Sequence, residues 1–358
     1  MKIAIVGAGL AGLSCALEFE RHGVICHIYE RDGSVGWVWP SSSFWPRIFT
    51  NDLGEIVHYL NEKFDISINY LGKARNIVLK SPNCEVRASG SNLGYFFERG
   101  KLSKSIENQI YRKLHYSPVF FNTKADYIKL AKEYDYVIIA SGKTDEAKDL
   151  EVWQEYDKCY IYGGIAIGSF DNESSTIYFN TEYAGTGYAR VTPLTSSQAV
   201  VGIYVIGLGD VELETDSLFE RFLSMENLVS LDFIYKLRPN IFEMGRVSNV
   251  KKGNIHLTGR AAGLTDRLIG VGGYYAIISG ILAARSIVNG QDYEEMIKPL
   301  IEGVENISAF RSIISKYTND DFDKLLKILG LPGIKQIIYN TDLNFTNIAG
   351  RILKHLNS

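Results

Sequence analysis

Residues 2–36 read KIAIVGAGLAGLSCALEFERHGVICHIYERDGSVG, and this stretch predicts the fold of the N-terminal part of the chain. Residues 2–6 have the apolar pattern of a buried strand, and apolar residues then recur at helical spacing from Leu13 to Phe19. A second predicted strand, over residues 24–29, leads directly to Glu30. This order of strand, glycine turn, helix, strand and acid is typical of a unit that binds a dinucleotide.

Three glycines form a GxGxxG turn between the first strand and the helix. Gly7 permits the tight turn, Gly9 lets the backbone approach a pyrophosphate, and Gly12 lets the helix pack closely on the strand. The unpaired N–H groups at the start of the helix favour a phosphate, and Glu30 can accept hydrogen bonds from a ribose diol. The predicted contact residues of this unit are Gly7, Ala8, Gly9, Leu10, Ala11, Gly12, Glu30 and Arg31.

Length, charge and cysteine usage narrow the class of protein. The chain has 358 residues, which suits one large or two joined domains, and its net charge of −3 provides no general attraction to nucleic acid. Its four cysteines form no CxxC pair and no zinc-ligand spacing, so we expect no metal site. The apolar start is interrupted by glycines, and the apolar run over residues 274–288 is shorter than the about 20 residues of a membrane span. We therefore expect a cytoplasmic protein and leave peripheral membrane contact open.

The rest of the chain predicts an interrupted α/β fold. Residues 36–51 are rich in Trp, Pro and Ser and indicate a loop, whereas the alternating pattern over residues 151–246 indicates an antiparallel sheet. Residues 274–288 form an apolar helical run, and the tail is helical in pattern. We predict a discontinuous Rossmann-like domain over residues 1–150 and 247–292, an inserted antiparallel-sheet substrate domain over 151–246, and a helical C-terminal region over 293–358.

Together these patterns resemble the geranylgeranyl reductase group of FAD-dependent oxidoreductases, within the para-hydroxybenzoate-hydroxylase-like fold. Besides the N-terminal unit, the similarity rests on GYFFERGKLSKSI (94–106), DYVIIASGKT (135–144) and TGRAAGLTDRLIGVGGYYAIISGILAA (258–284). It covers roughly residues 1–289 and implies FAD as the cofactor. The cofactor residues that it adds are Arg99, Ser141, Gly142, Gly259, Arg260, Gly270, Gly272 and Gly273.

The resemblance also implies how the last segment meets the flavin. Gly270, Gly272 and Gly273 would let backbone N–H groups reach the isoalloxazine at the start of a helix. A helix N-terminus at that place stabilises the negative charge that develops on the flavin when it is reduced. The alternative interpretation is that these glycines only allow close helix packing.

Three arginines depart from the family pattern. Arg260 stands where the family has an aspartate that binds the ribityl chain, Arg267 replaces a proline, and Arg190 replaces a cavity tryptophan. In one interpretation Arg260 turns toward the FAD phosphates or toward Asp266 and FAD still binds. In the other the site has changed and binds FAD poorly.

The same departures suggest which residues meet the substrate. Tyr188 and Arg190 are the candidate catalytic residues, since both fall on a strand that lines the family's substrate cavity. We hypothesise that Arg190 or Arg267 contacts an anionic group of the substrate, with a surface or structural ion pair as the alternative for each.

The resemblance implies hydride transfer from reduced FAD to a carbon–carbon double bond of an isoprenoid or related alkene. A single-component monooxygenase or hydroxylase is the alternative enzyme, and a flavin halogenase is less favoured because Ala189 and Arg190 stand in the region of its tryptophan motif. A flavin-binding redox sensor or partner subunit without turnover is the alternative of another class. Since no second GxGxxG unit follows, we expect ferredoxin or transiently bound NAD(P)H to supply the electrons.

Overall fold

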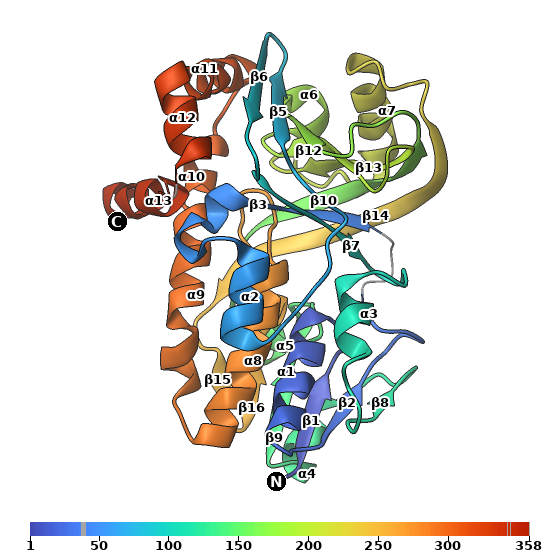
Figure 1. Cartoon of the computed structure of the whole chain (residues 1–358), viewed down its shortest axis with the longest axis vertical. Helices are drawn as coiled ribbons and strands as arrows, with labels where there is room; N and C mark the ends of the chain where they lie inside the picture. The colour runs from blue at the N-terminus through green and yellow to red at the C-terminus, as the bar shows by residue number, and fades with distance from the viewer. Residues whose placement is uncertain (37–40, 342, 344, 358) are drawn as a thin grey trace.

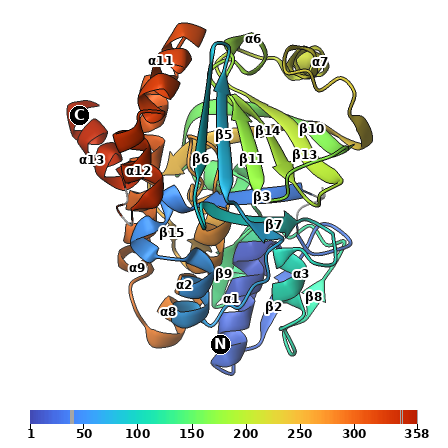
Figure 2. The same ribbon diagram turned by 45° about the horizontal axis from the view of Figure 1, so that its top comes forward.

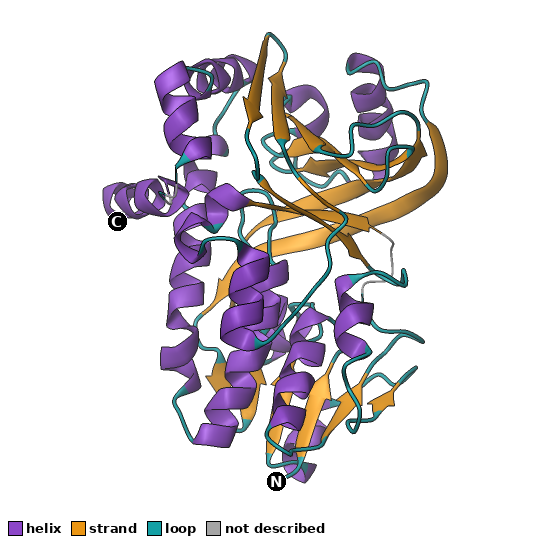
Figure 3. Cartoon of the chain, viewed as in Figure 1, coloured by secondary structure: helices purple, strands orange, loops and turns teal. Residues whose placement is uncertain are grey.

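The computed structural model describes residues 1–36, 41–341, 343 and 345–357. The chain forms two bodies, one below the other in Figure 1, with a small sheet between them and helices along one side. The lower body contains the N-terminus and a sheet flanked by helices, and the upper body is built around a larger, curved sheet, as the colouring by secondary structure in Figure 3 shows. This arrangement agrees with the predicted α/β class.

The lower sheet is the Rossmann-like one, with strand order β15-β16-β9-β1-β2-β8. Its parallel strands are β1 (Ile3–Val6), β2 (Cys26–Tyr29), β8 (Val119–Phe120), β9 (Tyr136–Ile139) and β16 (Ile255–Leu257), and β15 (Lys251–Lys252) pairs antiparallel to β16. Residues of β1 pair with both β2 and β9, with Ile3 opposite Cys26 and Tyr136. The carboxyl ends of β1, β9 and β16 therefore meet at one edge of the sheet, where ligands bind in folds of this kind.

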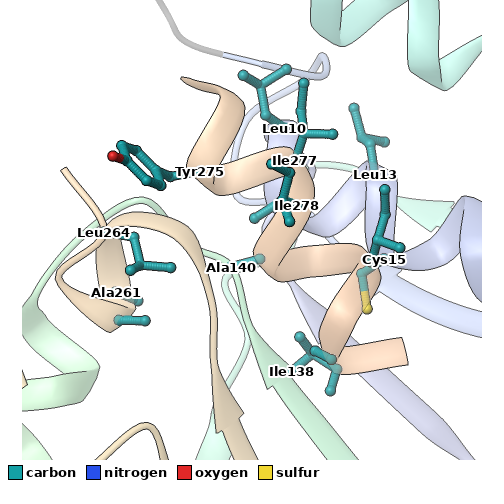
Figure 4. Packing of buried hydrophobic residues seen from close by; sticks show 14 of the residues in the cluster. Leu10, Leu13, Cys15, Ile138, Ala140, Ala261, Leu264, Tyr275, Ile277 and Ile278 are labelled. Atoms are coloured by element: carbon teal, nitrogen blue, oxygen red, sulfur yellow. The ribbon is translucent and has the colours of Figure 1, made fainter. Parts of the chain in front are cut away.

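Helices cover this sheet on both faces, as parallel strands require. The helices of the lower body are α1 (Leu10–Arg21), α2 (Ile56–Phe64), α3 (Ile106–Tyr111), α4 (Tyr127–Glu133), α5 (Asp145–Asp149) and α8 (Gly273–Asn289). Among them, α1 contacts β1 and β2, α4 contacts β9, and α2 packs on α8. Apolar side chains of α1 and α8 pack together, with Leu10 and Leu13 near Ile277 and Ile278 in Figure 4. The two helices come so close at Gly280 that a Cβ there would lie 2.1 Å from the carbonyl oxygen of Ala11.

The upper sheet has seven strands in the order β14-β10-β13-β12-β11-β5-β6. They are β5 (Asn76–Ser81), β6 (Cys84–Ser89), β10 (Trp153–Ile167), β11 (Ser174–Tyr178), β12 (Tyr188–Pro193), β13 (Gln198–Val205) and β14 (Asp232–Val247). All pairs are antiparallel except β11 with β5, which is parallel. The sheet thus takes in two strands from outside residues 151–246. The helices α6 (Thr181–Ala184) and α7 (Thr215–Met225) lie beside it in Figure 2.

A three-stranded sheet joins the two bodies. Its strands are β3 (Ser41–Pro46), β4 (Gly72–Lys73) and β7 (Gly94–Arg99), in the order β3-β7-β4. The prediction of a loop over residues 36–51 is therefore wrong for 41–46, while residues 37–40 lie outside the described part. Ser and Pro suggested a loop, but backbone pairing with β7 and burial of Phe44 and Trp45 make this segment a strand.

The C-terminal helices run along one side of both bodies (Figure 1). They are α9 (Tyr293–Ser308), α10 (Phe310–Ile314), α11 (Asn319–Leu329), α12 (Pro332–Asn340) and α13 (Phe345–Asn357), and short 3-10 turns lie at Arg47–Phe49, Asn51–Leu53, Glu212–Glu214 and Gly259–Ala262. The predicted helical tail is confirmed. Within the described ranges, the helices are too short or too polar to cross a bilayer.

Candidate functional site

A cavity of about 560 Å³ opens at the carboxyl edge of the lower sheet and extends to the upper sheet. Its volume lies within the range of small-molecule and cofactor sites. The predicted site residues that line it are Gly7, Gly9, Leu10, Ala11, Glu30, Arg31, Arg99, Ser141, Gly142, Tyr188, Arg190, Gly259, Arg260, Gly270, Gly272 and Gly273. Ala8 and Gly12 do not line the cavity and belong to the layer beneath it. The fold thus brings segments from opposite parts of the chain together, such as Gly7 and Gly273.

The three glycines of the first turn have different surroundings. A Cβ at Gly12 would lie 2.0 Å from the carbonyl oxygen of Gly7, and a Cβ at Gly7 would lie 2.5 Å from that of Ala140. Gly9, in contrast, has nothing within 4 Å of a Cβ position. Gly7 and Gly12 are therefore needed for packing among β1, α1 and β9, whereas Gly9 leaves open space at the cavity.

The start of α1 offers hydrogen-bond donors to a ligand. Gly9 is the N-cap of α1, and no side chain caps the helix there, so the N–H groups of the first turn lack an intrahelical acceptor. Nearby, the buried carboxylate of Glu30 accepts hydrogen bonds from the backbone N–H groups of Ala8 (2.7 Å) and Asp32 (2.8 Å). A carboxylate has about four acceptor positions, so Glu30 keeps capacity for a ribose diol.

A second uncapped helix start, that of α8, opens on the same cavity. Gly272 is its N-cap and has no side-chain cap, and Gly270 has a left-handed φ of 76°. A Cβ at Gly273 would lie 2.4 Å from the Trp45 ring, so β3 packs directly against this helix start. The sequence interpretation missed Trp45, because it lay in a segment that was predicted to be a loop.

Asp266 organises the backbone between Arg260 and α8. Its buried carboxylate accepts hydrogen bonds from four consecutive N–H groups, those of residues 268–271, at 2.6–3.3 Å. Burial raises the pKa of Asp266 to about 6, although these four hydrogen bonds act to lower it. Because the carboxylate is engaged in this way, the interpretation that pairs Arg260 with Asp266 is wrong.

Arg260 instead lies over the ring of Phe242 on β14, with its guanidinium carbon 3.7 Å from the ring centroid. It makes no hydrogen bond or ion pair to any described residue, and its Nε atom is enclosed without a partner. Burial lowers the pKa of Arg260 to about 10, which still leaves it charged at neutral pH. The carboxylates of Glu243 and Asp145 act to raise this pKa from beyond ion-pair distance. The guanidinium therefore keeps hydrogen-bonding capacity for an anionic group of a ligand.

Two other arginines at the cavity already have carboxylate partners. Arg267 forms a bidentate pair with Glu305 of α9, at 2.8 and 3.0 Å. Arg99 donates through Nε to Glu107 at 2.8 Å. The hypothesis that Arg267 contacts an anionic substrate is thereby weakened, since its charge is balanced within the protein.

Tyr188 and Arg190 lie on β12, at the upper wall of the cavity. The Tyr188 hydroxyl donates to the carbonyl oxygen of Ile269 at 2.6 Å, and its ring stacks on Tyr204 with centroids 4.5 Å apart. Arg190 lies over the other ring of this stack, 5.1 Å from the Tyr204 centroid, and donates to the carbonyl oxygen of Ser42 at 3.1 Å. Through this hydrogen bond Tyr188 positions the segment before α8. Because its single hydroxyl proton is donated to Ile269, it is not free to protonate a substrate.

Two more predicted residues lie where β9 ends. Ser141 donates to Glu146 at 2.8 Å, and Gly142 has a left-handed φ of 67° with open space around a Cβ position. The cavity residues that the sequence interpretation missed include Ser43, Phe44, Cys159, Ile161, Ile206, Phe242 and Met244. They lie in or directly after strands of the upper sheet and of the three-stranded sheet, and no sequence motif marks them.

The comparisons with known proteins agree with this architecture. A family model described as an NAD(P)-binding Rossmann-like domain matches residues 5–63. No curated protein matches the sequence. A geranylgeranyl bacteriochlorophyll reductase-like protein from Thermoplasma acidophilum aligns with a TM-score of 0.75 and 17% identity over 98% of each chain.

Two further solved structures share the fold. A flavin-dependent brominase aligns with a TM-score of 0.66 and 12% identity, over 99% of this chain and 98% of that one. The tetrameric form of 2-methyl-3-hydroxypyridine-5-carboxylic acid oxygenase aligns with a TM-score of 0.59 and 13% identity over 97% of each chain. Residues 5–63 therefore match a Rossmann-like domain, and the chain shares its whole fold with a geranylgeranyl bacteriochlorophyll reductase-like protein, as the sequence resemblance predicted.

Proposed function

We propose that the chain is an FAD-dependent oxidoreductase. The observation that supports this most directly is that two uncapped helix starts, of α1 and α8, open on one cavity with a buried carboxylate at one side. Helix N-termini attract the phosphates of a dinucleotide and the negative charge of a reduced flavin. When bound, FAD would supply hydride-transfer chemistry that amino-acid side chains lack.

The residues present suit the different parts of FAD. Glu30 would accept hydrogen bonds from the adenosine ribose, and the open space at Gly9 would admit the pyrophosphate at the start of α1. The start of α8 at Gly272 would face the isoalloxazine. Arg260, which forms no ion pair with the described residues, would balance phosphate charge.

For the reaction, we favour reduction of a carbon–carbon double bond in an isoprenoid or related alkene. The similarity to a reductase-like structure supports this choice. Beyond the start of α8, the cavity wall contains Ile161, Ile206 and Met244, which suit an apolar substrate. The electrons would come from ferredoxin or NAD(P)H.

Hydroxylation by a monooxygenase is the second candidate, supported by the likeness to an oxygenase. The two enzymes differ in what reoxidises the reduced protein. A reductase is reoxidised by an alkene without oxygen, whereas a monooxygenase consumes oxygen together with its substrate. A redox sensor or partner subunit would hold FAD and be turned over by neither.

The first experiment is the absorption spectrum of the purified protein, with the released cofactor identified. We expect a flavin spectrum and release of FAD. A colourless protein that also fails to take up added FAD would contradict the proposal, and would support the interpretation that the arginines have changed the site.

Replacing Arg260 tests its role at the cofactor. We expect Arg260→Met to weaken FAD binding by roughly 10- to 100-fold, because one charge-assisted hydrogen bond contributes about 1.5–3 kcal/mol. The FAD-free variant should unfold at a higher temperature than the FAD-free parent, since a charge over Phe242 that forms no ion pair is removed. Titration of FAD and thermal unfolding measure the two effects.

The control is Arg246→Met, which removes an exposed arginine of β14 that does not line the cavity. This variant should leave FAD affinity unchanged. If Arg260→Met bound FAD as tightly as the parent, Arg260 would have no role in holding the cofactor.

A further inference from the structure

The basic side chains that line the cavity fall into two groups. Four have a carboxylate partner: Arg31 with Asp32 (3.7 Å), Arg99 with Glu107 (2.8 Å), Lys143 with Asp145 (3.8 Å) and Arg267 with Glu305 (2.8 Å). Arg190 and Arg260 form no ion pair with any residue that the structure describes. Arg190 and Arg260 are therefore the two basic side chains of the cavity that have no described carboxylate within ion-pair distance, although Glu243 acts on Arg260 from farther away.

The two arginines without an ion pair come from different elements around the cavity. Arg260 follows Gly259, where a Cβ would lie 3.2 Å from Ala11, so its backbone is beside the start of α1 and the expected phosphate position. Arg190 lies on β12 of the upper sheet, beside Tyr188, whose hydroxyl contacts the segment before α8. FAD would supply a counter-ion for Arg260 and leave Arg190 without one.

The surroundings of Arg190 hold its guanidinium in place without neutralising it. One face lies over the Tyr204 ring, one Nη group donates to the carbonyl oxygen of Ser42, and Nε is enclosed without a partner. Aromatic faces and carbonyl oxygens position a cation but carry no net charge. The nearby carboxylate of Asp266 is occupied by four backbone N–H groups and forms no ion pair with Arg190.

An apolar cluster of the upper sheet lines the cavity, and it packs against both the Tyr204 ring beside Arg190 and the Phe242 ring beneath Arg260. Cys159, Ile161, Ile206, Phe242 and Met244 line the cavity from β10, the end of β13 and β14. Such a wall binds a hydrocarbon portion, and one fixed guanidinium suits one planar anionic group, which it can bind through two parallel hydrogen bonds.

We propose that the substrate is an unsaturated carboxylate with an apolar body, and that Arg190 binds its carboxylate. This inference rests on the proposed function, because it assigns the substrate class of the same cavity. Arg190 contributes recognition of charge, and the wall formed by Cys159, Ile206 and Met244 contributes recognition of the apolar body.

The test compares acids with the matching alcohols on the protein as purified with its FAD. Geranate and geraniol, cinnamate and cinnamyl alcohol, and dodecenoate and dodecenol each share one carbon skeleton and differ in charge. Isothermal titration calorimetry measures binding of all six to the parent, to Arg190→Met and to Arg190→Lys. Arg246→Met is the control, because it removes an exposed arginine of the same sheet that lies outside the cavity.

We expect at least one acid to bind the parent about 10- to 100-fold more tightly than its alcohol, as for a hydrogen bond to a charged group. Arg190→Met should abolish this preference, Arg190→Lys should retain part of it, and Arg246→Met should keep it in full. Equal binding of acid and alcohol, an acid preference that persists in Arg190→Met, or no binding of any acid would overturn the inference. FAD content is measured independently, from the absorption spectrum. A protein without FAD would contradict the proposed function, whereas an FAD-containing protein without an acid preference would contradict this inference alone.

Discussion

At the scale of single residues, the partners of the arginines decide the charge of the cavity. Arg260 and Arg267 are seven positions apart in one glycine-rich segment, and the sequence alone left two interpretations open for each of them. The structure separates them, since Arg267 pairs with Glu305 and Arg260 lies on the ring of Phe242. Both partners are distant in sequence, so no local pattern could identify them.

Asp266 predicts an unusual dependence of stability on pH. Its pKa is raised by burial to about 6, above the about 3.9 of a free aspartate. The folded state therefore holds this proton more tightly, and the associated stability is fully present below pH about 4 and lost as pH rises through about 6. The expected loss is on the order of a few kcal/mol.

The measurement is the free energy of unfolding of the parent and of Asp266→Asn from pH 4 to pH 7. The parent should lose stability relative to the variant over this range, because the variant has no carboxyl group to ionise. A difference between the two proteins that stays constant with pH would show that Asp266 keeps an ordinary pKa.

At the level of secondary-structure elements, the glycine turn before α1 has two roles, close packing of the helix and access for a ligand, and different glycines carry them. Gly12 allows α1 to approach the end of β1, and Gly9 leaves space at the cavity. The sequence predicted both roles, because strand, turn and helix follow one another and their geometry depends on local backbone sterics.

Alanine substitutions distinguish the two roles. Gly12→Ala should destabilise the protein by about 1–3 kcal/mol or more, because its Cβ would lie 2.0 Å from the Gly7 carbonyl oxygen. Gly9→Ala should change stability by less than about 0.5 kcal/mol, since φ is −89° and the space is open, yet should weaken FAD binding at least about 10-fold. Thermal unfolding and FAD titration test both, and unchanged FAD affinity in Gly9→Ala would contradict the proposed position of the pyrophosphate.

At the scale of the whole molecule, the C-terminal helices connect the lower body to the upper sheet. Asp323 of α11 is buried and accepts hydrogen bonds from Ser81 and Asn83 at the turn between β5 and β6, including one of 2.9 Å from Asn83 Nδ2. Burial acts to raise the pKa of Asp323, but these hydrogen bonds outweigh it and lower the pKa. The tail therefore holds two strands that the sequence alone did not assign to the upper sheet.

We expect Asp323→Asn to lower the free energy of unfolding at pH 7 by roughly 1.5–3 kcal/mol, the contribution of hydrogen bonds to a charged group. Because the pKa is lowered in the folded state, this stability is lost as pH falls through the folded pKa, so parent and variant should converge in acid. Denaturant unfolding at both pH values provides the measurement. A loss that is as large in acid as at pH 7 would indicate a packing effect instead of a charge effect.

The N-terminal βαβ unit, the apolar helix at Gly273–Asn289 and the helical tail could be predicted from the sequence, because they depend on short-range periodicity and backbone sterics. Long-range contacts make Ser41–Pro46 a strand, bring β5 and β6 into the upper sheet, and leave Arg190 and Arg260 without an ion pair to the described residues. Strand partners and counter-ions are chosen among residues far apart in the chain, where burial and electrostatics outweigh local preference.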